Sequence, residues 1–380
     1  MRTLPLFPVT TVGSWPRPEP LRRALGDLRR GRIARAAFER TADEAVRDLI
    51  GLQEREGCDL LTDGELRRDN FYSFVAGKMD GVRLMSLAEM LDVVEDKAGF
   101  ERILEALDVP AYAISTPTCV GRIARREPLV LEDLRFVRQH TDRPVKVTLP
   151  GPYLLTRAMF VPELTRAAYP TKEALAGDVV RLLGDEMRAL AQAGADFIQL
   201  DEPVLTELAL APGRPRTFMC AALAARADPA EEIEFAVSLI NQVADVVDGV
   251  RIGVHVCRGN WSRDETTLLR GGYQPLASCL DRLRVAQLVL EYATERAGDL
   301  LPFAGKELGL GVVNPRTDRL ESSDEICRVV RRALYLYPPE RIFLNPDCGF
   351  GTFSSRPMNT PARALAKVRA MVEAARVLRG

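Results

Sequence analysis

The feature that most constrains the fold is an alternation of short apolar runs with longer amphipathic segments along the 380 residues. Runs that are apolar throughout indicate strands buried on both faces, as in a parallel sheet covered by helices. The strand-like runs are 9–13, 59–62, 145–149, 197–200, 252–256, 287–290, 308–313 and 341–344, and the helical ones are about 34–55, 172–193, 229–247, 323–336 and 360–378. Eight strand–helix alternations predict an α/β fold that closes most naturally into a (β/α)8 barrel of the TIM type.

Two details refine this prediction. An open doubly wound sheet is the alternative, but it would need a glycine-rich phosphate turn after the first strand, and the segment 11–16 is not one. Residues 66–140 are too many for one helix between the second and third strands, and they include a further strand-like run at 113–120. We therefore predict a single catalytic barrel over 1–380, with an insertion at 66–140 made of a hairpin arm and helices.

Composition excludes several classes of function. The formal net charge is −1 with 28% charged residues, so there is no basic surface for nucleic acid or a membrane. The N-terminus lacks the pattern of a signal peptide, and no apolar stretch approaches the length of a membrane span. The seven cysteines are an odd number and scattered, which fits reduced thiols, and we expect Cys279 and Cys327 in the core. The expected location is the cytoplasm.

A histidine and two cysteines are the first candidates for a metal site. His255 and Cys257 end an apolar run, and residues two apart in a strand point to the same face. Imidazole with thiolate is a ligand set that suits zinc. We expect Cys348, before a glycine-rich turn, as the third ligand and Glu291, at the end of another run, as the fourth. The alternative is that these cysteines pack as small hydrophobic residues.

The ends of the other predicted strands are also chemically capable. In a barrel of this type, active-site groups come from the C-terminal ends of the strands and the loops after them. Almost every predicted strand has a carboxylate, a metal-capable side chain or a Pro/Gly turn at that end, namely Gly13-Ser14, Asp63-Gly64-Glu65, 150–152, Asp201-Glu202-Pro203, 255–257, Glu291, 314–316 and 345–348. For the segment at 201–203 alone, a helix N-cap with proline in the first turn is the alternative.

Six segments, in order from end to end, resemble the C-terminal catalytic barrel of cobalamin-independent methionine synthase. They are the Thr-Thr-Val-Gly-Ser-Trp-Pro, Asp-Gly-Glu-Leu-Arg-Arg-Asp, Leu-Pro-Gly-Pro, Gln-Leu-Asp-Glu-Pro, His-Val-Cys and Asn-Pro-Asp-Cys-Gly elements at 10–16, 63–69, 149–152, 199–203, 255–257 and 345–349. The resemblance covers essentially the whole chain. No segment corresponds to the N-terminal barrel of the full-length enzymes, so the chain is similar to a shorter, single-barrel branch.

The resemblance implies a zinc-dependent methyltransferase that makes methionine from homocysteine. One zinc ion per chain would be held by the three ligands above together with Glu291, and the amino acid end of homocysteine would meet Gly13, Ser14, Glu65 and Asp201. Zinc removes the proton of a coordinated thiol, and a methyl group then passes to sulfur by in-line displacement.

On the side of the methyl donor the chain departs from the family pattern. The family's acid is a histidine in a His-Ser-Pro-Arg turn, and the matching turn here has Asn314, which cannot act as a general acid near pH 7. The only other histidine, His140, is expected at the opposite end of the barrel. The indole expected to stack on the pterin is replaced by Thr156 or Arg157. The expected methyl donor is therefore 5-methyltetrahydrofolate or a methylated corrinoid. The corrinoid is an alternative because its leaving group, cob(I)alamin, needs no proton, and it would be supplied by a corrinoid protein as partner.

Two further functions fit the same motifs. One is a zinc-dependent alkyltransferase that acts on another thiol such as coenzyme M. A sulfonate acceptor should prefer basic residues, so Glu65 and Asp201 argue against it. The other is a zinc- or thiol-binding protein without catalysis.

Overall fold

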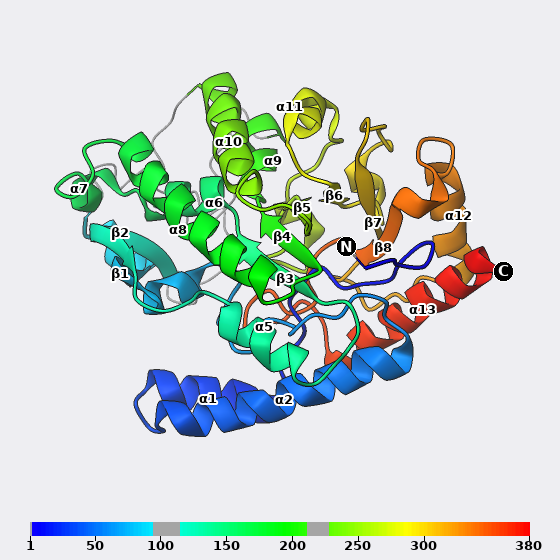
Figure 1. Cartoon of the computed structure of the whole chain (residues 1–380), viewed down its shortest axis with the longest axis horizontal. Helices are drawn as coiled ribbons and strands as arrows, with labels where there is room; N and C mark the ends of the chain where they lie inside the picture. The colour runs from blue at the N-terminus through cyan, green and yellow to red at the C-terminus, as the bar shows by residue number, and fades with distance from the viewer. Residues whose placement is uncertain (1, 94–114, 211–227) are drawn as a thin grey trace.

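The computed structural model describes residues 2–93, 115–210 and 228–380 (Figure 1). Its centre is a parallel sheet of six strands that are hydrogen-bonded in the order of the chain. The strands are β3 (Lys146–Pro150), β4 (Phe197–Asp201), β5 (Arg251–Val256), β6 (Gln287–Leu290), β7 (Glu307–Val313) and β8 (Ile342–Pro346). Nearly all of their residues are buried, which confirms the reading of the later six apolar runs as strands covered on both faces.

The prediction of strands at 9–13 and 59–62 is wrong, because each of these segments forms only a single β-bridge in the described structure. Val9 forms a parallel bridge with Leu344 of β8, and Leu61 forms one with Val145 next to β3. The Asp59 N–H donates to the Val9 carbonyl at 2.9 Å, so the two segments also contact each other. Pro8 has no N–H to extend the ladder, which is one reason why the pairing stays short.

Helices cover the sheet, and the five predicted ones lie within a few residues of their expected bounds. The capping box is present, because Ser322 accepts from the Glu325 N–H at 3.3 Å and Glu325 accepts from the Ser322 N–H at 2.8 Å. The α-helices are α1 (Glu19–Arg29), α2 (Arg35–Glu56), α3 (Leu87–Leu91), α5 (Leu131–Arg138), α6 (Pro152–Met159), α7 (Pro162–Thr165), α8 (Lys172–Gln192), α9 (Val204–Leu210), α10 (Pro229–Ala244), α11 (Ala277–Arg282), α12 (Ser323–Ala333) and α13 (Pro361–Arg379). Short 3-10 helices are η1 (Ser73–Gly77), η3 (Glu265–Thr267), η4 (Gln274–Leu276), η5 (Glu295–Ala297) and η6 (Pro339–Arg341).

Between Leu61 and β3 the chain forms an antiparallel pair, β1 (Met79–Ser86) with β2 (Ser115–Arg125). The strand-like run predicted at 113–120 is part of β2 from 115 onward, and 113–114 lie outside the described residues. The pair packs beside α6 and α7, at the left of Figure 1.

The sheet carries a small apolar cluster near the strand ends that bear polar groups. This cluster, separate from the large one, is formed by Val12, Leu60, Phe197 and Val289. Phe197 lies on the same face of β4 as Asp201, because side chains two apart share a face. The sheet therefore carries an apolar layer with polar groups at the ends of its strands. Among the described residues, no helix is long and apolar enough to cross a bilayer.

Candidate metal centre and substrate pocket

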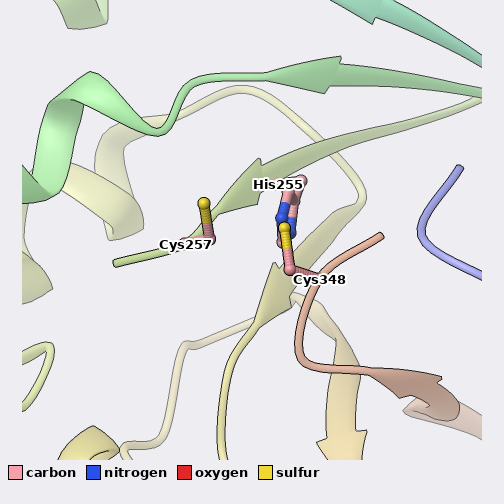
Figure 2. A group of neighbouring side chains, drawn as sticks. All are labelled: His255, Cys257 and Cys348. Carbon is pink, nitrogen blue, oxygen red and sulfur yellow. The ribbon is translucent and has the colours of Figure 1, made fainter. Parts of the chain in front are cut away.

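The three predicted zinc ligands come together at the ends of β5 and β8. One ligand atom each of His255, Cys257 and Cys348 lies within 4.8 Å of the others, and all three residues are buried (Figure 2). His255 is the last residue but one of β5 and Cys257 directly follows that strand, while Cys348 follows β8. These residues can hold a metal ion, and the structure brings them together from positions about ninety residues apart in sequence.

The orientation of His255 fits a metal ligand. Its Nδ1 lies 3.0 Å from the Val289 carbonyl oxygen, which accepts the Nδ1 proton. Its Nε2 is buried and has no hydrogen-bond partner within 2–93, 115–210 and 228–380. A metal-binding histidine commonly donates one ring N–H to a carbonyl and leaves the other nitrogen for the metal. The unpartnered Nε2 therefore marks the direction in which a cation would bind.

The two cysteines are unequal in their protonation. A hydrogen bond from Cys348 lowers the pKa of Cys257 well below its usual value, and His255 lowers it further against the effect of burial. The same hydrogen bond and burial raise the pKa of Cys348 well above its usual value. Burial lowers the pKa of His255, but its interaction with Cys257 outweighs this and raises the pKa to about 9. In the metal-free protein, Cys257 therefore favours the thiolate form next to a positively charged His255. A metal ion that binds thiolates can replace this positive charge.

Glu291, the predicted fourth ligand, lies outside this three-residue group. Its carboxylate is almost fully buried and is paired with three buried arginines, Arg258, Arg296 and Arg316. Burial raises the pKa of Glu291, but the arginines outweigh it and lower the pKa. Glu291 therefore remains ionised beside the cluster, and its coordination of a metal stays a prediction.

Two further groups hold the loops of the centre in place. The carboxylate of Asp347, next to Cys348, accepts hydrogen bonds of 2.8 and 2.9 Å from the two backbone N–H groups that follow Glu291. The Tyr273 hydroxyl donates to the Val256 carbonyl at 2.6 Å. The same hydroxyl accepts from the Glu291 N–H at 3.0 Å, so the loops after β5, β6 and β8 are tied to one another. Asp347 belongs to the predicted strand end 345–348, without a role of its own there, and sequence reasoning did not single out Tyr273.

A pocket borders the three-residue group and includes most of the predicted substrate contacts. Ser14, Glu65 and Asp201 line it together with His255 and both cysteines. Aromatic and polar side chains that the sequence analysis did not select complete the wall, namely Phe71, Tyr72, Asn260, Trp261 and Phe353. The pocket thus combines sulfur and nitrogen ligands, two carboxylates and aromatic surface.

Close backbone approach explains two glycines at the pocket. A Cβ atom on Gly13 would collide with a carboxylate oxygen of Glu65, and one on Gly349 would collide with the Ser14 hydroxyl. Glu65 itself has a φ of 53°, which is uncommon for a residue with a side chain. Such backbone strain clusters at functional sites, and here it directs a carboxylate into the pocket.

The two pocket carboxylates influence each other. Burial raises the pKa of Asp201, His255 opposes this, and the charge of Glu65 adds to the rise, which brings the pKa to about 7. Asp201 therefore gains or loses its charge near neutral pH. A cation placed between the two carboxylates would favour the charged form.

Residues predicted for the donor side lie elsewhere. Asn314 does not line the pocket, and its Nδ2 donates to Glu265 at 2.6 Å while its Oδ1 accepts from the Arg316 N–H at 3.0 Å. Thr156 and Arg157 are buried in α6 and do not line the pocket either. A different indole, that of Trp261 on the loop after β5, lines the pocket.

Comparison with known proteins agrees with this geometry. The family described as "Cobalamin-independent synthase, Catalytic domain" matches residues 7–377. The chain belongs to the cobalamin-independent methionine synthase family. It is 30% identical to the methionine synthase of Pyrococcus abyssi, over 99% of this chain and 94% of that protein.

Two more relatives extend the comparison. The chain is 27% identical to the 5-methyltetrahydropteroyltriglutamate–homocysteine methyltransferase of Halalkalibacterium halodurans, over 99% of this chain but only 44% of that longer protein. Its fold matches the structure of a B12-independent methionine synthase from a Shewanella species in complex with selenomethionine, with a TM-score of 0.71, 20% identity and 98% of each chain covered. A methylated corrinoid donor and a corrinoid-protein partner, both expected from the sequence, do not fit a cobalamin-independent family.

Proposed function

We propose that this protein is a zinc-dependent methyltransferase that transfers a methyl group to the thiol of homocysteine and releases methionine. The observation that carries the proposal is one buried pocket lined by His255, two cysteines, Glu65 and Asp201. The cysteines and the histidine supply ligands for zinc, and the carboxylates supply partners for an ammonium group. An amino acid with a thiol is the substrate that needs both.

The scaffold of this activity is a single (β/α)8 barrel over 1–380 with 66–140 as an insertion. Six parallel strands are hydrogen-bonded in sequence order. The bridges of Val9 to Leu344 and of Leu61 to Val145, with the hydrogen bond from Asp59 to Val9, support closure through the two short N-terminal segments. The pocket then lies at the C-terminal ends of the strands, where active sites of such barrels are found.

Zinc would be held by His255, Cys257 and Cys348, with Glu291 as the fourth ligand. When bound, the metal would convert the substrate thiol to a thiolate near neutral pH. Hydrogen bonds of Asp347 and Tyr273 hold in place the loops that carry these ligands. Glu291 would have to leave part of its pairing with the arginines to reach the metal.

The amino acid end of the acceptor would lie against Ser14, Glu65 and Asp201. Both carboxylates are buried, so they would form strong charge-assisted hydrogen bonds with an ammonium group that replaces its water shell with these oxygens. This pairing fixes the distance between the ammonium group and the thiol, and so positions the sulfur for in-line attack on the methyl group.

The methyl donor is a 5-methyltetrahydrofolate-type pterin. The Halalkalibacterium relative is named for such a donor, and the pocket has an aromatic wall that includes Trp261 and Phe353. Asn314 stands where the family's acid is expected, so the amine leaving group receives less assistance here than in the family pattern.

A methyl-transfer assay with zinc-loaded protein tests the proposal. Methyl-tetrahydrofolate, as the mono- and triglutamate, is supplied with homocysteine or with coenzyme M, and methionine or methyl-coenzyme M is quantified. Methionine formation that depends on bound zinc is the expected result. Methylation of coenzyme M in preference to homocysteine, or zinc binding with no transfer to either thiol, would contradict it.

A further inference from the structure

One layer below the pocket, the inner face of the sheet carries polar side chains that the proposed mechanism does not use. Thr148 of β3 and Gln199 of β4 are partners in the parallel register, and both are buried. The Gln199 Nε2 donates to Asp201 Oδ1 at 2.8 Å, and the Thr148 hydroxyl donates to Glu65 Oε1 at 2.9 Å. Each pocket carboxylate thus rests on one neutral side chain of the sheet.

Each of these neutral side chains is in turn held by a buried cation. The Lys146 ammonium donates to Gln199 Oε1 at 3.2 Å and to the Thr11 carbonyl. The Arg68 guanidinium donates to the Thr148 hydroxyl oxygen at 3.0 Å. Neither cation lines the pocket.

The donor inventory of these groups fixes their orientation. A lysine ammonium has only donors, so it must face the amide oxygen of Gln199, which leaves the amide N–H to point at Asp201. A guanidinium also has only donors, so Arg68 occupies the acceptor side of the Thr148 hydroxyl. The hydroxyl proton is then directed to Glu65. Both chains of hydrogen bonds therefore run in one direction, from cation to pocket.

Electrostatics gives the same assignment. A charge buried without a counter-charge is costly, and buried lysines are rare unless paired. Lys146 is 1% exposed and makes no direct ion pair with any described residue, while burial lowers its pKa to about 7 against the raising effects of Asp201 and Glu65. The two carboxylates are thus the charges that favour the protonated form of Lys146.

We propose that Lys146 is a positioning residue, which acts through Gln199 to hold Asp201 as one half of a receptor for the ammonium group of the acceptor. Arg68 does the same for Glu65 through Thr148. This inference rests on the proposed function, because it assumes an acceptor with an ammonium group. It adds the residues that set the selectivity for that group, none of which the acceptor touches.

The test compares two thiols in zinc-loaded protein. Homocysteine and 4-mercaptobutanoate share the thiol and the carboxylate, and only homocysteine has the amine. Lys146→Met removes the charge and the donors at nearly equal side-chain length. We expect the Kd for homocysteine to rise about tenfold or more, as for a weakened charged hydrogen bond, while the Kd for 4-mercaptobutanoate and the zinc content stay unchanged. Thr148→Val should give the same pattern through Glu65.

A second buried lysine provides the matched control. Lys367 of α13 is fully buried and donates to Glu321 at 2.7 Å, and neither residue lines the pocket. Lys367→Met should lower the thermal stability but leave both Kd values unchanged. Gln199→Met carries the same expectation as Lys146→Met, and decides the question should the lysine variant fail to fold.

The outcomes separate this inference from the function on which it rests. If wild-type protein binds both thiols equally, the amino acid acceptor is wrong and the inference falls with it. If the wild type prefers homocysteine and Lys146→Met and Gln199→Met keep that preference, the acceptor stands and the positioning role is refuted. Equal weakening of both thiols in these variants would also refute it, since that indicates a general structural role.

Discussion

At the scale of single residues, the thiolates decide whether the metal centre exists. Cys257→Ser and Cys348→Ser should each lose bound zinc and activity, because a hydroxyl does not replace a thiolate ligand. Metal analysis of protein purified without chelator measures this. Cys327→Ser is the control, because Cys327 is a buried cysteine of α12 outside the cluster and its variant should keep one zinc per chain. Retention of zinc by both cluster variants would contradict the assignment.

The two carboxylates should decide which thiol binds. Asp201→Asn and Glu65→Gln should each weaken homocysteine binding by about 1–3 kcal/mol, the range for hydrogen bonds to charged groups. Calorimetric titration of zinc-loaded protein gives the change in binding free energy. Zinc content should not change, since neither residue belongs to the ligand group. Normal homocysteine affinity in both variants would show that the ammonium group does not bind here.

Asp201 should also impose a pH dependence. Its pKa is raised to about 7, so below that pH the free protein holds a neutral carboxylic acid that cannot pair with an ammonium group. The Kd of homocysteine, relative to that of 4-mercaptobutanoate, should therefore rise as the pH falls from 7.5 to 5.5, by up to about tenfold per pH unit. Asp201→Asn should flatten this relative profile. The effect of pH on stability has the opposite direction to its effect on binding. Because folding raises the pKa of Asp201, the metal-free protein loses stability as the pH rises through about 7.

At the scale of elements, the turn after β7 is where the donor chemistry should be limited. Asn314 cannot give a proton to the folate amine, and general acid catalysis contributes about 10²–10⁴-fold in rate. We expect slow folate-dependent turnover by the wild type and faster turnover by Asn314→His, measured as methionine formed per zinc-loaded chain. A variant that is no faster, in protein whose zinc content and homocysteine Kd are normal, would show that another group serves as the acid.

The elements also show which features a sequence can predict. The His255–Cys257 pair was predictable because strand periodicity is local, and Cys348 because a glycine-rich turn follows a predicted strand. The arginines around Glu291 were not, since Arg258, Arg296 and Arg316 come from three different loops and only the fold brings them to one carboxylate. Trp261 was not predictable for the same reason, since only the fold brings the loop after β5 to the pocket wall.

Strand length was the less predictable part of the fold. Apolar composition correctly predicts that the segments at 9–13 and 59–62 lie next to the sheet. Among the described residues, however, each segment forms a single β-bridge. Composition reports burial, whereas the extent of pairing depends on the partner strand and on which residues can donate. A proline without an N–H next to Val9 limits a ladder that hydropathy alone would extend.

At the scale of the whole molecule, zinc should stabilise the fold. A metal that binds the native state and has little affinity for the unfolded chain raises the unfolding free energy by about 2.7 kcal/mol when its free concentration is a hundred times the Kd. Chelation should therefore lower the Tm by several degrees, and added zinc should restore it. The Cys348→Ser protein serves as reference, because its Tm should not respond to zinc or chelator. An equal Tm for chelated and zinc-loaded wild type would mean that zinc does not bind the native fold.

The order in which the ligands occur along the chain has a consequence for biosynthesis. His255 and Cys257 emerge from the ribosome well before Cys348, which follows the last strand of the sheet. The same strand supplies Leu344, the partner of Val9, so the first and last parts of the sheet meet only when translation is nearly finished. A nascent or truncated chain that stops before β8 lacks both the third ligand and that contact. If the centre binds zinc as proposed, metal uptake would be coupled to completion of the polypeptide, and an incomplete chain would not hold zinc through these three ligands.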